Sequence, residues 1–207
     1  WSAACASLVI DRAAFAVFGE FGRKFAAEAA GAPHLAAAIV DEAPDGRLAT
    51  VAPREGVDAY AYPHNETSTG VVSPLYRPAA DALTLVDATS IAGAAPVDLA
   101  DVDAYYFSLQ KAFGSDGGLW VAVLSPAAVA RTAVCAGMPG RWVPSILDLG
   151  AAIANSRKDQ TLNTPAIATI VMAQQQVCWL NALGSMAQVH ARCEHSSSLI
   201  YRWADSH

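Results

Sequence analysis

The sequence predicts an α/β protein in which a mainly parallel β-sheet packs in layers with helices. Three observations lead to this fold class. Short apolar runs of strand length alternate with longer helical stretches, turn residues separate the two, and 54% of the 207 residues are hydrophobic while 15% are charged. Neighbouring parallel strands need long crossover connections, which are usually helices, so this alternation favours a parallel sheet. The composition is that of a globular protein.

The first thirty residues predict a helix, a strand and a second helix. Residues 1–10 are alanine-rich and helical, and "RAAFAVFGEF" (12–21) predicts a short strand that ends in a turn at Gly19. The next helix runs from Glu20 to about Ala30, because Phe21, Phe25 and Ala29 recur at four-residue spacing on one face. A Gly-Ala-Pro sequence at 31–33 closes it.

The middle of the chain predicts the remaining strands. Residues 41–56 are polar and rich in turn residues. Four strands follow, in "VDAYAYPHN" (57–65), "DALTLVDATS" (81–90), "VDAYYFSLQK" (102–111) and "GLWVAVLSP" (118–126). Pro126 opens a helix. The last third predicts two more helices, one starting at Pro165 and ending before Gly184, and one over 185–206.

Charge and cysteine content exclude several classes of function. The net charge is −6 and no Lys/Arg cluster reverses it locally, which argues against a nucleic-acid partner. No apolar run reaches the roughly 18 residues of a membrane span, and no signal peptide is evident. The four cysteines are scattered and form no C-x-x-C pair, which is typical of a reducing compartment and predicts neither disulfides nor a metal site. We therefore expect a cytoplasmic protein.

Candidate functional residues follow the predicted strands. In parallel sheets, ligands bind at the carboxyl ends of the strands. Thr67, Asp87 and Lys111 all lie at such ends, and the last two stand on successive strands. An amine, a carboxylate and a hydroxyl are the groups that pyridoxal phosphate needs for its aldehyde, its ring nitrogen and its phenolic oxygen. Phe21 could stack on the ring.

Each of these residues also has a structural interpretation that stays open at this point. A lysine at a strand end is often simply solvated, and Asp87 could cap the following segment. Thr67 could be a turn hydroxyl, and Phe21 could belong to the core. His64 is more often a structural hydrogen-bonding residue than an acid or base.

Four blocks together resemble the phosphoserine aminotransferases, and among them the actinobacterial branch. These blocks are "HNETSTGV" (64–71), "VDATSIAG" (86–93), "DAYYFSLQKAFGSDGGLW" (103–120) and "NSRKDQTLNTPAIATI" (155–170). Their order and spacing also resemble that family, through nearly all of the chain. The resemblance implies the three-layer large domain of fold-type I pyridoxal-phosphate enzymes, class V, with residues 1–207 forming part of that cofactor-binding domain.

The resemblance implies a role for each matching residue. Lys111 matches the lysine that binds the cofactor covalently, and Gln110 before it matches a glutamine near the cofactor phosphate. Asp87 matches the carboxylate at the pyridine nitrogen. Two further matches are Thr67, at the phenolic oxygen, and Phe21, at the ring-stacking aromatic. Asn163 and Thr164 match a pair that reaches the phosphate of the other subunit, which implies a homodimer with shared active sites.

The implied reaction is reversible amino transfer between glutamate and 3-phosphohydroxypyruvate in serine biosynthesis. There are departures from the family pattern: Ser108 and Leu109 stand where a smaller pair is usual, and Leu162 replaces an aromatic. The family's proteins are also longer. The resemblance implies a glycine-rich phosphate-binding turn before Trp1 and a small domain, carrying an arginine for the substrate carboxylate, after His207.

Two alternatives remain from the sequence. The nearest is another class V enzyme, such as an alanine–glyoxylate type aminotransferase or a cysteine desulfurase, although desulfurases usually have His where Gln110 stands. The other is a non-catalytic remnant of the fold. We expect the 207 residues alone to have no measurable transaminase activity, since they lack the implied outer segments.

Overall fold

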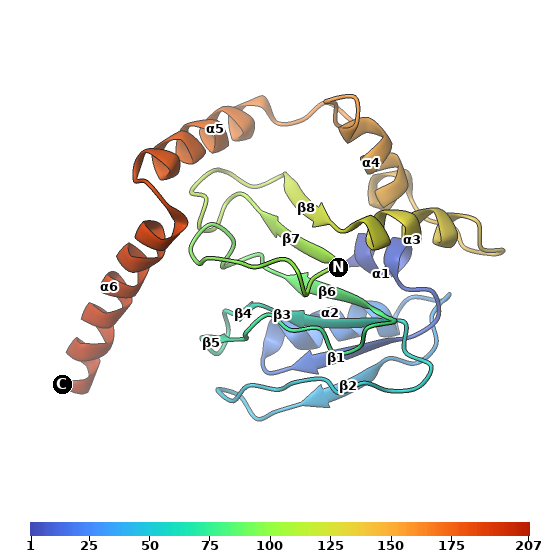
Figure 1. Ribbon diagram of the computed structural model, residues 1–207, viewed down its shortest axis with the longest axis horizontal. Coiled ribbons are helices and arrows are strands. Elements are labelled where there is room, and N and C mark those ends of the chain that lie inside the picture. The colour runs from blue at the N-terminus through green and yellow to red at the C-terminus, as the bar shows by residue number, and fades with distance from the viewer. The chain divides into compact units, whose positions relative to one another are not determined.

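The computed structural model describes all residues from Trp1 to His207, and these form two compact units. The first unit contains Trp1–Ala88, Leu99–Tyr106 and Ala122–Thr164. The second contains Thr89–Asp98, Phe107–Val121 and Pro165–His207. Figure 1 labels the helices and strands, which are described for each unit separately.

The sheet of the first unit has the strand order β2-β1-β3-β6-β7-β8. The strands are β1 (Ala13–Val17), β2 (Ile39–Glu42), β3 (Ala59–Pro63), β6 (Leu83–Asp87), β7 (Ala104–Ser108) and β8 (Trp120–Leu124). The first five pair in parallel with their neighbours. The last two of these six strands extend into segments assigned to the second unit. The amide of Ser125, just after β8, donates to the carbonyl of Asp103, just before β7, as expected for antiparallel neighbours.

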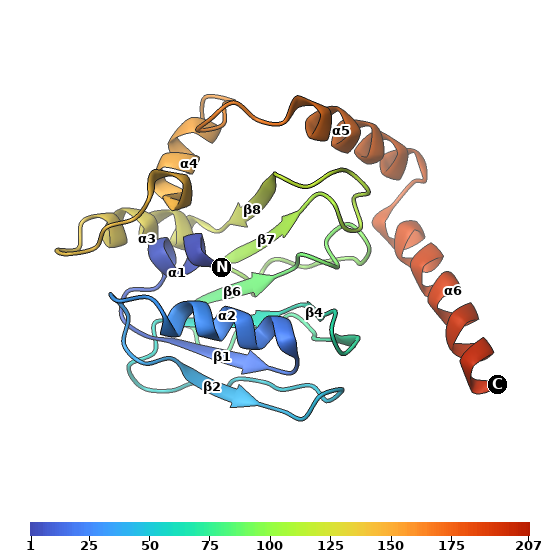
Figure 2. The ribbon, with the colours of Figure 1, turned by 180° about the vertical axis from the view of Figure 1, so that it is seen from behind.

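Four helices belong to this unit. They are α1 (Ser2–Leu8), α2 (Glu20–Ala30), α3 (Pro126–Ala136) and α4 (Leu149–Ser156), with a short 3₁₀ turn at Ser145–Leu147. One of them, α4, packs on α1 and α3. The side chain of Ser125 accepts a bond from the Ala128 amide and caps α3, and Pro126 occupies its first turn. Asp148 caps α4 in the same way. Figure 2 shows α2 lying along the strands that it contacts, β1 and β3.

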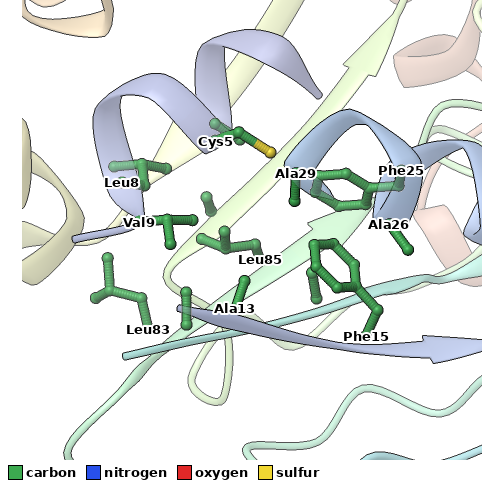
Figure 3. Packing of buried hydrophobic residues seen from close by; sticks show 14 of the residues in the cluster. Cys5, Leu8, Val9, Ala13, Phe15, Phe25, Ala26, Ala29, Leu83 and Leu85 are labelled. Atoms are coloured by element: carbon green, nitrogen blue, oxygen red, sulfur yellow. The ribbon is translucent and has the colours of Figure 1, made fainter. Parts of the chain in front are cut away.

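The core lies between these helices and the sheet, as Figure 3 shows. Cys5 and Leu8 come from α1, Phe25 from α2, Phe15 from β1 and Leu85 from β6, and none is more than 3% exposed. Side chains alternate between faces along a strand, so Leu83, Leu85 and Asp87 point to the same, helix-covered side. Burying each large apolar side chain stabilises the fold by about 1.5–3 kcal/mol relative to exposure.

The second unit consists of two loops and the helices α5 (Ile167–Ala182) and α6 (Met186–Asp205). The hydroxyl of Thr169 on α5 donates to the Gly117 carbonyl, and Ser115 Oγ donates to the Thr169 carbonyl. Ser185 and Gln188 form a capping box at the start of α6. His190 Nδ1 lies 3.2 Å from the Ala94 carbonyl oxygen.

Most predicted elements are confirmed, and the prediction of a mainly parallel α/β sheet is confirmed with them. Four elements were not predicted from the sequence: the edge strand β2, the two-residue strands β4 (Asn65–Glu66) and β5 (Val71–Val72), and α4. The first alternates between half-buried and exposed residues within a turn-rich region, so its pattern is weak. No helix is both long enough and apolar enough to cross a membrane.

Candidate functional site

Three chain segments lie at the edge of the sheet where the parallel strands of the first unit end. Because β1, β3 and β6 run parallel, their carboxyl ends lie at one edge of the sheet. The turn 18–21 follows β1, the short β4–β5 hairpin follows β3, and Asp87 is the last residue of β6. The predicted residues Phe21, Thr67 and Asp87 therefore belong to the same edge.

A buried glutamate joins the first two of these segments. Glu66 is completely inaccessible to solvent. Its carboxylate accepts from the amides of Phe21 (3.3 Å) and Gly22 (2.8 Å) at the start of α2. It also accepts from Ser68, through the amide at 3.2 Å and the hydroxyl at 2.6 Å. A carboxylate at a helix start satisfies orphan amides and complements the positive end of the helix dipole.

Gly19 is required by this arrangement because of space. A Cβ atom at Gly19 would lie 2.4 Å from Glu66 Cγ and 2.6 Å from Ser68 Oγ. The Glu66 side chain is already fixed by its hydrogen bonds, so it has little freedom to move away. The Ser68 hydroxyl additionally accepts from the Glu20 amide at 2.9 Å, and Thr69 Oγ1 donates to the Phe18 carbonyl at 3.1 Å. The turn after β1 is thus bonded directly to the β4–β5 turn.

This linkage presents an aromatic ring and a hydroxyl from neighbouring turns. Phe21 lies in the first turn of α2 and is half-buried, with the ammonium of Lys24 5.5 Å from its ring centroid. Thr67 lies in the turn between β4 and β5 and is exposed. Both are accessible to a ligand at the sheet edge.

Asp87 is the most firmly held of the predicted residues. It is 6% exposed. Its carboxylate Oδ2 accepts a 2.6 Å hydrogen bond from the indole Nε1 of Trp1. Its backbone carbonyl accepts a hydrogen bond from the His64 amide at 2.8 Å. In the sheet, Asp87 stands opposite Tyr106 on β7. A carboxylate this deeply buried needs hydrogen-bond donors, and the indole of Trp1 supplies one.

His64, which follows β3, forms a buried pair with Tyr105 on β7. His64 Nδ1 lies 3.1 Å from the Tyr105 hydroxyl, and the two rings meet edge to face at 5.9 Å. Burial lowers the pKa of His64 to about 4, because the charged imidazolium loses hydration. Burial also raises the pKa of Tyr105 above its usual value. The imidazole is therefore neutral at pH 7, which agrees with a structural role.

The other predicted residues lie elsewhere in the chain's two units. Gln110 and Lys111 are exposed in a turn of the second unit, after β7, where the Gly114 amide donates to the Lys111 carbonyl. Asn163 and Thr164 are exposed at the end of the first unit. The Asn163 carbonyl accepts from the Thr161 hydroxyl at 2.6 Å. The convergence of Lys111 with Asp87, and the functional roles of all seven predicted site residues, stay predictions.

The groups at the edge fit the ring of pyridoxal phosphate. A buried, oriented carboxylate suits a protonated ring nitrogen, an exposed hydroxyl suits the phenolic oxygen, and an accessible aromatic suits the ring face.

Two residues that organise this edge, Trp1 and Glu66, were not predicted from the sequence. The available signals were an aromatic residue at position 1 and an acidic residue beside Thr67, and neither residue type is specific for a role at a binding site. No group of three or more His, Cys, Asp or Glu side chains could hold a metal ion, and all four cysteines are free thiols.

Comparison with known proteins defines the class. Residues 47–203 match the family described as Aminotransferase class-V, and the chain belongs to this family. Particular relatives are the phosphoserine aminotransferases of Nocardioides sp. (49% identical over 210 residues) and Rhodococcus opacus (44% over 208 residues). The alignments cover 99% and 100% of this chain but 56% of each relative. The chain therefore spans about half the length of these relatives.

A solved structure supports the fold. The phosphoserine aminotransferase of Cytophaga hutchinsonii superposes with a TM-score of 0.89 at 23% identity, over 98% of this chain and 58% of that one. At this identity the likeness concerns the fold alone. It agrees with the mixed α/β architecture and the mainly parallel sheet described above.

Proposed function

We propose that the complete protein containing this chain is a phosphoserine aminotransferase that uses pyridoxal phosphate. The relatives that bear this name support the reaction, and one observation in the structure carries the cofactor assignment. That observation is the buried, hydrogen-bonded carboxylate of Asp87 at the same sheet edge as Phe21 and Thr67. The substrates are then glutamate and 3-phosphohydroxypyruvate, in serine biosynthesis.

The chain's own residues divide the work of binding and proton transfer. When bound, pyridoxal phosphate supplies an electron-withdrawing ring that stabilises negative charge at the substrate's Cα. Asp87 holds the ring nitrogen protonated, Thr67 binds the phenolic oxygen, and Phe21 covers a ring face. Lys111 Nζ would hold the cofactor until the amino group of the substrate displaced it, and the freed amine would then move the proton at the substrate's Cα as a general base and acid. Gln110 lies near the phosphate.

The proposed assembly is a homodimer acting in the cytoplasm. Asn163 and Thr164 then reach the phosphate bound by the partner subunit, and their exposure at a loop before α5 supports this. Apolar side chains exposed on α5 and α6 support an interface as well; these include Ile167 (62%), Trp179 (49%), Ile200 (67%) and Trp203 (63%). Side chains of this kind are seldom left in contact with water over a wide surface.

The test is an assay of the complete protein and its Lys111→Ala variant. The wild type should transfer the amino group of glutamate to 3-phosphohydroxypyruvate and should show cofactor absorbance in the visible range. Lys111→Ala should lose both the absorbance of the covalent adduct and nearly all turnover, whereas Lys158→Ala, on an exposed turn, should keep them. Preferential turnover of alanine with glyoxylate would refute the substrate assignment. Full activity in Lys111→Ala would refute the catalytic assignment.

A further inference from the structure

We propose that Trp1 is a positioning residue for Asp87: its indole N–H orients the carboxylate toward the ring nitrogen and thereby sets the affinity for pyridoxal phosphate. This inference rests on the proposed function, because it takes Asp87 as the partner of the ring nitrogen. The observation behind it is the 2.6 Å hydrogen bond from Trp1 Nε1 to Asp87 Oδ2. A short N–H donor bond to a carboxylate is among the stronger hydrogen bonds in proteins.

The indole is itself held in place by aromatic packing. Its ring stacks on Phe25 with centroids 6.0 Å apart and planes 17° apart. Phe25 in turn meets Phe15 edge to face at 5.1 Å and Tyr106 at 6.1 Å. The Trp1 carbonyl accepts from the Cys5 amide at 2.9 Å, which fixes the backbone at the start of α1. The donor therefore approaches the carboxylate in a direction set by the core.

The carboxylate's backbone is held equally well. Asp87 pairs with Pro63 on β3 and with Tyr106 on β7, and its carbonyl accepts from the His64 amide. With both backbones fixed, the remaining freedom is the rotation of the Asp87 side chain, and the Trp1 bond restricts it. A carboxylate has about four lone-pair sites, so a bond from the indole does not prevent a second bond from a ring N–H.

A purely structural role for the pair makes a different prediction. If Trp1 only fills space against Phe25, its replacement should weaken the binding of every cofactor analogue to the same extent. If it acts through Asp87, the loss should appear only for ligands with a ring nitrogen. An analogue of pyridoxal phosphate in which carbon replaces that nitrogen separates the two cases, because it keeps the ring's shape and the phosphate.

The experiment compares dissociation constants in the complete protein, in a Lys111→Ala background so that binding is non-covalent. Trp1→Phe keeps an aromatic ring for Phe25 and removes the donor. It should weaken pyridoxal phosphate about tenfold, equivalent to about 1.4 kcal/mol, and the carbon analogue less than twofold. Trp142→Phe makes the same chemical change at a side chain that is 80% exposed, and should alter neither constant. Equal melting temperatures of the cofactor-free variants verify that each is folded.

The outcomes distinguish this inference from the proposed function. Unchanged binding of pyridoxal phosphate to Trp1→Phe, or equal weakening of both ligands, would overturn the role of Trp1. If Asp87→Asn weakens pyridoxal phosphate while Trp1→Phe does not, the cofactor assignment stands and only the inference fails. If Asp87→Asn itself binds normally, the proposed role of Asp87 fails first. The double variant should bind no more weakly than Asp87→Asn alone, because Trp1 acts through that carboxylate.

Discussion

Replacing Glu66 should break the hydrogen bonds that hold the turn carrying Phe21 against the turn carrying Thr67. Glu66 is fully buried and receives hydrogen bonds from two amides at the start of α2 and from both the amide and the hydroxyl of Ser68. Glu66→Gln keeps the volume and one acceptor oxygen, but it turns an amide donor toward groups that are themselves donors. Glu66→Ala removes every acceptor and leaves a cavity.

The magnitude follows from the groups left unpaired. The Gly22 amide is buried and 2.8 Å from Glu66, and an unsatisfied buried donor costs about 1–3 kcal/mol. Loss of a negative charge at a helix start adds about 0.3–1 kcal/mol, and more when the site is buried. We expect Glu66→Gln to lower the free energy of unfolding by about 1–3 kcal/mol. Glu66→Ala should lower it by about 3–5 kcal/mol, since a cavity is added.

The assay combines urea unfolding of the complete protein with amide hydrogen exchange of the Phe21–Gly22 segment. Both Glu66 variants should lower the unfolding midpoint, and exchange should accelerate at these two amides before it does in β1. Glu28→Gln serves as a control, because Glu28 is exposed on the same helix. It should change stability by less than about 0.5 kcal/mol. Native stability and native amide protection in Glu66→Gln would refute the reasoning.

Three further predictions concern pH, subunit assembly and the chain alone. Because burial lowers the pKa of His64 from 6.5 to about 4, the unfolded chain takes up the proton first as pH falls. The free energy of unfolding should therefore drop by about 3 kcal/mol between pH 6.5 and 4, and His64→Gln should lack this component. Identical pH profiles of the wild type and His64→Gln in denaturant titrations would contradict this prediction. Hybrid dimers of Lys111→Ala with Asn163→Ala/Thr164→Ala subunits should regain activity through one intact site, and no recovery in purified hybrids would exclude a shared site. The 207 residues expressed alone should aggregate and turn over no substrate, given the apolar side chains exposed on α5 and α6; a monodisperse and active preparation would disprove this.

The strands could be predicted from the sequence because their signal is local. Buried runs such as those of β3 and β6 are apolar throughout and bounded by turns, which is typical of interior parallel strands. The edge strand β2 was not predicted, because only one side of it is half-buried and it lies within a segment rich in proline and glycine. The two-residue strands β4 and β5 are too short to show any period, and Glu66 in β4 makes its contacts with a helix more than forty residues earlier in the chain.

The candidate site could be predicted only in part, for a similar reason. Residue type and strand position led to Thr67, Asp87 and Lys111, because ligands bind at the carboxyl ends of parallel strands. The resemblance added Gln110, Asn163 and Thr164, and the roles of all these residues stay predictions. Trp1 and Glu66 could not be identified, because their importance comes from tertiary contacts across 86 and 44 residues.

The position of Asp87 follows from the alternation of side chains along β6. Alternation along β6 turns Leu83 and Leu85 into the core beneath α1 and α2, and the same alternation carries Asp87 to that side. A carboxylate at the next inward position would be unstable in an apolar core without hydrogen-bond donors. Trp1 meets that requirement from the start of α1 while its ring remains packed on Phe25. The end of β6 leaves the carboxylate 6% exposed, at the edge of the sheet where the proposed cofactor would bind.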